Sequence, residues 1–88
     1  MPIDRLRADL VRLREEIAAA EGGDREALAR LEELAAEVEQ ELDEEARLKD
    51  PAGLIEQFEQ GVSGFEASHP NLTAILNNIL SLLGSMGV

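Results

Sequence analysis

The pair of side chains best suited to chemistry lies in the stretch EASH, residues 66–69, where Glu66 and His69 are separated by two residues. On one continuous helix this spacing puts both side chains on the same face, and Glu-x-x-His supplies ligands in di-metal helical bundles. Pro70 follows directly, however, and a residue that precedes proline avoids helical backbone angles. We therefore expect no metal site and no cofactor. The alternative is a metal-binding helical bundle that uses Glu66 and His69.

Nucleophilic catalysis has few candidate groups in this chain. The serines are Ser63, Ser68, Ser81 and Ser85, and His69 is the only histidine available as a base. Ser68 is its neighbour in sequence, and adjacent residues rarely form the hydrogen bond that activates a nucleophile. The paired acids of the N-terminal half are typical of solvated helix faces. The sequence thus predicts a protein that is not an enzyme and has no catalytic residue.

The charge of the chain excludes further function classes. The formal net charge is -11, and residues 1–50 hold all 8 basic residues together with 16 of the 19 acidic ones. Binding to nucleic acid or anionic lipid requires clustered Lys or Arg, whereas Arg5, Arg7, Arg12 and Arg14 alternate with acids. We expect no nucleic-acid partner. The charged N-terminus, the lack of Cys and the lack of a run of about 20 apolar residues predict a cytoplasmic protein without a transmembrane segment.

Two helices are predicted in the first half of the chain, over residues 2–21 and 25–48. Each has an apolar seam with alternating spacings of three and four residues, which is typical of coiled coils. The seams are Ile3, Leu6, Leu10, Leu13, Ile17 and Ala20, then Leu28, Leu31, Ala35, Val38 and Leu42. Gly22-Gly23 interrupts the pattern, and Asp24 is suited to cap the second helix. We expect an antiparallel helical hairpin over residues 2–48.

The charges favour the same pairing of the two helices. Folding the chain back at Gly22-Gly23 brings basic residues of the first helix close to acidic residues of the second. In this register Arg12 and Arg14 lie near Glu32 and Glu33, and Arg5 and Arg7 lie near Glu39 and Glu41.

Two shorter helices are predicted over residues 51–88, and together with the hairpin they make one all-α domain over residues 1–88. Asp50 and Pro51 suit the start of one helix, and Pro70 suits the first position of the other. Gly61 and Gly64 lie beside the apolar face of the first of these helices. They indicate either close approach of a neighbouring helix or a frayed, kinked helix.

The last helix has no charged side chain from Asn71 to Val88, although the protein is strongly acidic. Its apolar face is wide, and the opposite stripe of Thr73, Asn77, Ser81, Gly84 and Ser85 is polar but uncharged. Such a helix is usually covered on most sides. We expect a second copy of the chain to cover it and complete the bundle. The predicted interface residues are Leu72, Ile75, Leu76, Ile79, Leu82, Leu83 and Met86.

The leading hypothesis is therefore a non-catalytic interaction protein that forms a homo-oligomer, with a dimer favoured. An unidentified protein partner is a further expectation. Besides the metal-binding bundle, the alternative is a peripheral membrane or cargo tag formed by the C-terminal helix.

The ending of the chain resembles that of a small bacterial family of uncharacterised acidic helical proteins. The matching positions are Phe65 to Pro70, Leu72, and Met86 to Val88, while Gly84-Ser85 replaces a pair like Ser-Asn. The resemblance implies a bacterial, cytoplasmic protein of unknown function. It implies no catalytic residues.

Overall fold

The computed structural model describes residues 2–45, 47–65 and 68–87, and within these ranges the chain is helical and has no strand. The helices are α1 (Pro2–Ala19), α2 (Arg25–Glu45), α3 (Pro51–Phe65) and α4 (Pro70–Gly87). Together they form an elongated body with principal extents of 35 × 21 × 20 Å. None of the helices in the described ranges has the length and apolar character needed to cross a membrane.

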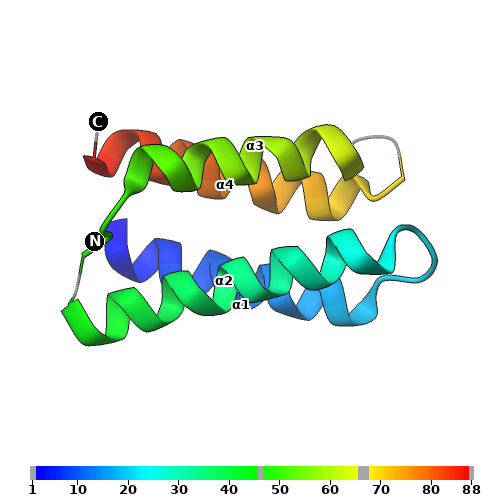
Figure 1. Cartoon of the computed structure of the whole chain (residues 1–88), viewed down its shortest axis with the longest axis horizontal. Coiled ribbons are helices and arrows are strands. Elements are labelled where there is room, and N and C mark those ends of the chain that lie inside the picture. Colours follow the sequence, from blue (N-terminus) through cyan, green and yellow to red (C-terminus); the bar gives the residue numbers. More distant parts are fainter. Residues whose placement is uncertain (1, 46, 66–67, 88) are drawn as a thin grey trace.

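The helices are arranged so that each one runs opposite to the one before it in the chain (Figure 1). The first turn of α1 and the last turn of α4 therefore lie at the same end of the bundle. Among the described residues, α4 packs closely against both α1 and α3, α2 packs against α1, and α2 and α3 make the sparsest helix pair. The seam between α2 and α3 is consequently the most open one.

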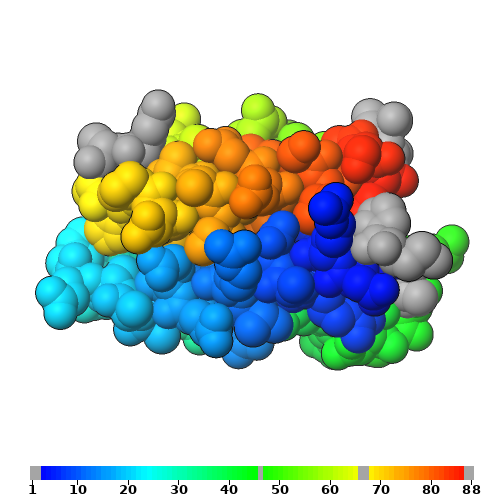
Figure 2. Space-filling model, turned by 180° about the vertical axis from the view of Figure 1, so that it is seen from behind, coloured from blue at the N-terminus to red at the C-terminus, as the bar shows by residue number. Residues whose placement is uncertain are grey.

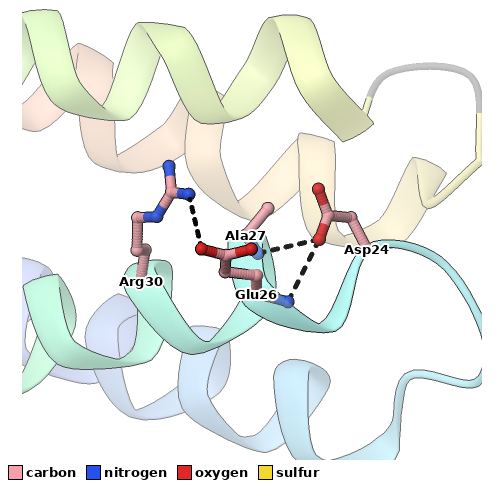
Figure 3. A network of polar contacts seen from close by, with 4 residues as sticks. All are labelled: Asp24, Glu26, Ala27 and Arg30. Carbon is pink, nitrogen blue, oxygen red and sulfur yellow. Dashed lines mark hydrogen bonds and ion pairs between the residues drawn. The ribbon is translucent and has the colours of Figure 1, made fainter.

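Helix starts follow the predicted capping residues. The Asp24 Oδ1 atom accepts hydrogen bonds from the backbone N–H groups of Glu26 at 3.1 Å and Ala27 at 3.2 Å (Figure 3). Likewise, Asp50 Oδ1 accepts a bond from the Gly53 N–H at 3.1 Å. These contacts satisfy N–H groups that have no partner within the helix. They confirm both predicted caps.

Proline positions confirm the remaining helix starts. Pro51 and Pro70 are the first residues of α3 and α4, where the missing N–H of proline is harmless. His69 is non-helical, as its place before Pro70 predicts. Its carbonyl oxygen accepts the backbone N–H of Thr73 at 3.0 Å and so closes the first turn of α4.

The second helix ends at Glu45, three residues before the predicted end at Leu48. Its last turn contains acidic residues and no basic one, which is unfavourable at the negative end of the helix dipole. Beyond this end, the backbone N–H of Lys49 donates to the carboxylate of Glu41 at 2.9 Å. The first helix also ends slightly early, at Ala19 instead of Glu21.

One hydrophobic core runs through the bundle, and all four helices contribute to it. The predicted seams supply most of its members from α1 and α2, while α3 adds Leu54, Phe58 and Phe65. From α4, five side chains are at most 7 % exposed: Leu72, Ile75, Leu76, Ile79 and Leu83. Packing between α1 and α3 therefore covers most of the apolar face of α4 within a single chain.

Ion pairs between α1 and α2 form in a different register from the predicted one. Arg14 pairs with Glu39 at 2.7 Å and Arg7 with Asp43 at 2.9 Å, while Arg12 pairs within its own helix with Asp9 at 3.7 Å. Helical side chains tilt toward the N-terminus of their helix. In an antiparallel pair, an arginine of α1 thus leans away from the connecting turn and an acid of α2 leans toward it. Each arginine therefore meets an acid further along α2 than the residue directly opposite.

Candidate functional site

His69 lies where the two loops at one end of the bundle meet. Its ring packs against Phe65, with ring centroids 5.6 Å apart. On another side it faces the α1–α2 turn, because a Cβ atom added to Gly23 would lie 3.0 Å from His69 Cε1. Both ring nitrogens are buried and have no hydrogen-bond partner among the residues that the structure describes. The imidazole therefore acts as a packing element between two loops that are distant in sequence.

This environment limits the chemistry of His69. A general base must reach the proton that it abstracts, and the buried Nδ1 and Nε2 atoms are not presented to a substrate. The other residue of the metal alternative, Glu66, lies outside the described residues. Across the described ranges, no three His, Cys, Asp or Glu side chains are grouped so that they could hold a metal ion.

The seven predicted interface residues do not share one surface. Leu72, Ile75, Leu76, Ile79 and Leu83 are in the core of the single chain, and only Leu82 and Met86 are partly exposed. A second copy is thus not needed to cover the five buried side chains. A bilayer or cargo surface cannot reach these five side chains while the bundle is closed. The alternative of a peripheral membrane or cargo tag would therefore require α4 to leave the bundle.

The surface that α4 does present is the polar, uncharged stripe. Its exposed residues are Asn71, Ala74, Asn77, Asn78, Ser81, Gly84 and Ser85. Thr73, which the sequence pattern grouped with this stripe, is partly buried, and its hydroxyl donates to the His69 carbonyl at 3.0 Å. The exposed side of α4 therefore carries no charge.

Helix α1 borders this stripe on one side. Shallow hollows along the α1–α4 seam bring Asn78 together with Arg5 and Asp9 in one, and with Arg12, Glu15 and Glu16 in another. Figure 2 shows α1 and α4 in contact along this side of the molecule. We call this surface, formed by the exposed residues of α4 and by Arg5, Ala8 and Arg12 of α1, the α1–α4 face.

Sequence reasoning found the uncharged stripe but not its neighbours. The spacing of Asn77, Ser81 and Ser85 along one helix is a local signal, so it can be read from the sequence. The placement of Arg5 and Arg12 beside Asn78 depends on which helices pack together, and no spacing in the sequence encodes that directly.

The fold and this surface define a class: a small acidic helical protein with one uncharged helix face. The chain belongs to the family described as Domain of unknown function (DUF4404), whose model matches residues 6–88. This agrees with the expected membership of an uncharacterised family. Comparison with curated proteins finds no match. Comparison with solved structures finds none either.

Proposed function

We propose that the protein is a non-catalytic interaction protein that associates with a second copy of itself through the α1–α4 face. The observation that carries this proposal is the absence of charge on the exposed side of α4. In a protein of net charge -11, like charges oppose close approach of two copies over most of the surface. The exposed side of α4 lacks this repulsion.

The groups on this face suit a two-fold symmetric contact. In such a contact the same surface of each copy faces the other, so Asn78 can exchange amide hydrogen bonds with its counterpart. Ala74, Ser81 and Gly84 are small and allow two helices to approach closely. The partly exposed Leu82 borders the hollow next to Arg5 and adds apolar area at the edge.

The size of the face is sufficient. The bundle measures 35 Å by 21 Å in its two longest extents, and a specific interface buries roughly 800 Å² on each partner. One whole side of the bundle is of that order, so an interface of this size takes in α1 as well as the exposed side of α4. The five core residues of α4 then have a supporting role, because they hold the helix that carries the contact.

A non-catalytic role is supported by the state of the only histidine. The ring nitrogens of His69 are enclosed by the chain itself, so its imidazole is used in packing. We expect protein purified without chelator to contain no stoichiometric transition metal by elemental analysis. A metal that is lost on His69→Ala substitution would contradict this expectation.

Self-association is tested with Asn78→Glu/Ser81→Glu. Both positions are exposed, so the fold should be kept, while four added charges face one another across the two-fold axis. Sedimentation equilibrium should report a multiple of 9.6 kDa for the wild type and a folded monomer for the double variant. Added salt should strengthen wild-type association, because it screens the repulsion between copies.

The matched control is Ala52→Glu/Ser63→Glu, which adds the same charge at exposed positions of α3. It should remain associated. A wild type that is monomeric at about 100 µM, well above the micromolar range of standard interfaces, would overturn self-association. An associated Asn78→Glu/Ser81→Glu variant would overturn the choice of surface.

A further inference from the structure

A groove runs along the open seam between α2 and α3, on the side of the bundle that faces the viewer in Figure 1. This α2–α3 groove has a volume of about 310 Å³. We call its apolar and glycine lining residues the floor, namely Leu31 and Leu34 from α2 and Gly61, Gly64 and Phe65 from α3. Gln57 and Gln60 of α3 also line the groove. It lies on the opposite side of the molecule from the α1–α4 face shown in Figure 2.

Two glycines of α3 shape this floor in different ways. A Cβ atom on Gly61 would lie 3.1 Å from Leu31 Cδ2, so Gly61 allows α2 and α3 to approach. A Cβ atom on Gly64 would meet no atom within 4 Å. Glycine inside a helix lowers stability by about 1 kcal/mol relative to alanine. Packing within the chain accounts for Gly61, whereas no atom of the residues that the structure describes occupies the space at Gly64.

The polar rim of the groove is acidic on the α2 side. Glu33 and Glu37 line it, and the lining arginine, Arg30, already pairs with Glu26 at 3.3 Å (Figure 3). Glu37 also lines a second hollow further along α2, which is shared by Glu41, Glu44 and Glu45 and by one basic residue, Lys49. The α2 sequence as a whole has nine acidic and two basic side chains. Glu39 and Asp43 pair with arginines of α1, so the acids that line the groove itself are Glu33 and Glu37.

We propose that the α2–α3 groove binds a basic amphipathic helix of a partner protein. An apolar floor between two helices, with polar rims, accepts the apolar side chains of a helix at positions i, i+3, i+4 and i+7. Lys and Arg on the flanks of that helix complement Glu33, Glu37 and the acids beyond them. The groove follows α2 from Ala27 to Glu37, or about 15 Å at 1.5 Å per residue, which matches a partner helix of about three turns.

Charge selects this occupant over a second copy of the chain. A second copy would bring its own acidic surfaces against the rim of α2, and like charges at an interface are strongly unfavourable. On the α1–α4 face, the exposed residues of α4 carry no charge and therefore add no such repulsion. The two surfaces therefore serve different partners, and they lie far enough apart to be occupied at the same time.

The test uses the full chain and a labelled synthetic helical peptide as the probe, with leucines at helical spacing and lysines on both flanks. Fluorescence anisotropy should report saturable binding that weakens with salt. Gly64→Leu should reduce the affinity at least about tenfold, because it adds a large side chain to the lining of the groove. Gly64→Gln is a second obstruction, for use if the leucine variant does not fold. Ser63→Leu, on the outer side of α3, is the matched control and should bind like the wild type.

The contribution of the acidic rim to peptide binding is tested with two double variants. Glu33→Lys/Glu37→Lys should weaken binding of the lysine peptide about tenfold, whereas Glu56→Lys/Glu59→Lys, with the same change in net charge at exposed sites of α3, should have a much smaller effect. A peptide with the leucines replaced by serine and all lysines kept should bind weakly.

Several outcomes would overturn the proposal. They are equal binding to the wild type and to the obstructed variants, equal binding of the serine peptide, or no binding of the leucine–lysine peptide. Dissociation of the homo-oligomer by Gly64→Leu would instead make a second copy the occupant of the groove. Peptide binding should be intact in Asn78→Glu/Ser81→Glu, so failure of this inference and failure of self-association are separate results.

Discussion

At the scale of single residues, the contact between Gly23 and His69 joins two loops that are more than forty positions apart. Gly22 and Gly23 both have positive φ angles, of 71° and 78°, which side chains with a Cβ atom adopt at a cost of about 1 kcal/mol or more. Only Gly23 has a close neighbour, the His69 ring, at 3.0 Å from an added Cβ. The two glycines thus have the same backbone requirement but different surroundings.

This difference gives a prediction for Gly22→Ala and Gly23→Ala. Both should lower the free energy of unfolding by roughly 1 kcal/mol through backbone strain, and Gly23→Ala should lower it further because its methyl group meets the His69 ring. Urea denaturation measures both values. In a His69→Ala background the excess effect of Gly23→Ala should disappear. Equal effects of the two glycine substitutions in the wild type would show that the ring does not constrain this turn.

At the scale of the elements, α3 is the helix whose sequence left two interpretations open. Gly61 and Gly64 indicated either close helix approach or fraying. The helix is continuous from Pro51 to Phe65, and the contact between Gly61 and Leu31 is a close approach. The first interpretation therefore holds for Gly61, whereas Gly64 is open to solvent on the groove floor.

Alanine substitutions at these two sites should change the free energy of unfolding differently. Gly64→Ala should raise the free energy of unfolding by up to about 1 kcal/mol, since it gains helix propensity and meets no atom. Gly61→Ala gains the same propensity but must displace the Leu31 side chain, so we expect a net loss or no gain. Thermal melts followed by circular dichroism distinguish the two. A Gly61→Ala variant stabilised as much as Gly64→Ala would be inconsistent with close packing of α2 on α3.

At the scale of the whole molecule, the position of α4 decides what holds the bundle together. Ile79 and Leu83 are both fully buried in the single chain. A small domain has about 5–15 kcal/mol of stability in total, and an unpaired buried charge costs several kcal/mol. The core of one chain cannot absorb two such charges.

Ile79→Asp/Leu83→Asp should consequently unfold the chain at every protein concentration, with loss of the helical circular dichroism signal. Leu82→Asp, at a partly exposed position of the same helix, should remain folded. If the double variant were instead a folded monomer, α4 would be an interface helix, as the sequence alone suggested, and not part of the core.

Local features of this protein were determined by the sequence itself. Asp24, Asp50, Pro51 and Pro70 mark helix starts because capping bonds and proline geometry involve residues at most three or four positions apart. The apolar seams of α1 and α2 likewise show which side chains are buried, because a helical period of 3.6 residues converts spacing into a face.

Only the tertiary structure decided which faces meet. An apolar stripe on α4 is equally satisfied by another chain or by α1 and α3, since hydrophobic burial is not directional. The ion pairs of Arg7 and Arg14, the packing of His69 on Gly23, and the open space at Gly64 all depend on the relative placement of helices. That placement follows from the packing of all four helices together, and no short stretch of sequence contains it.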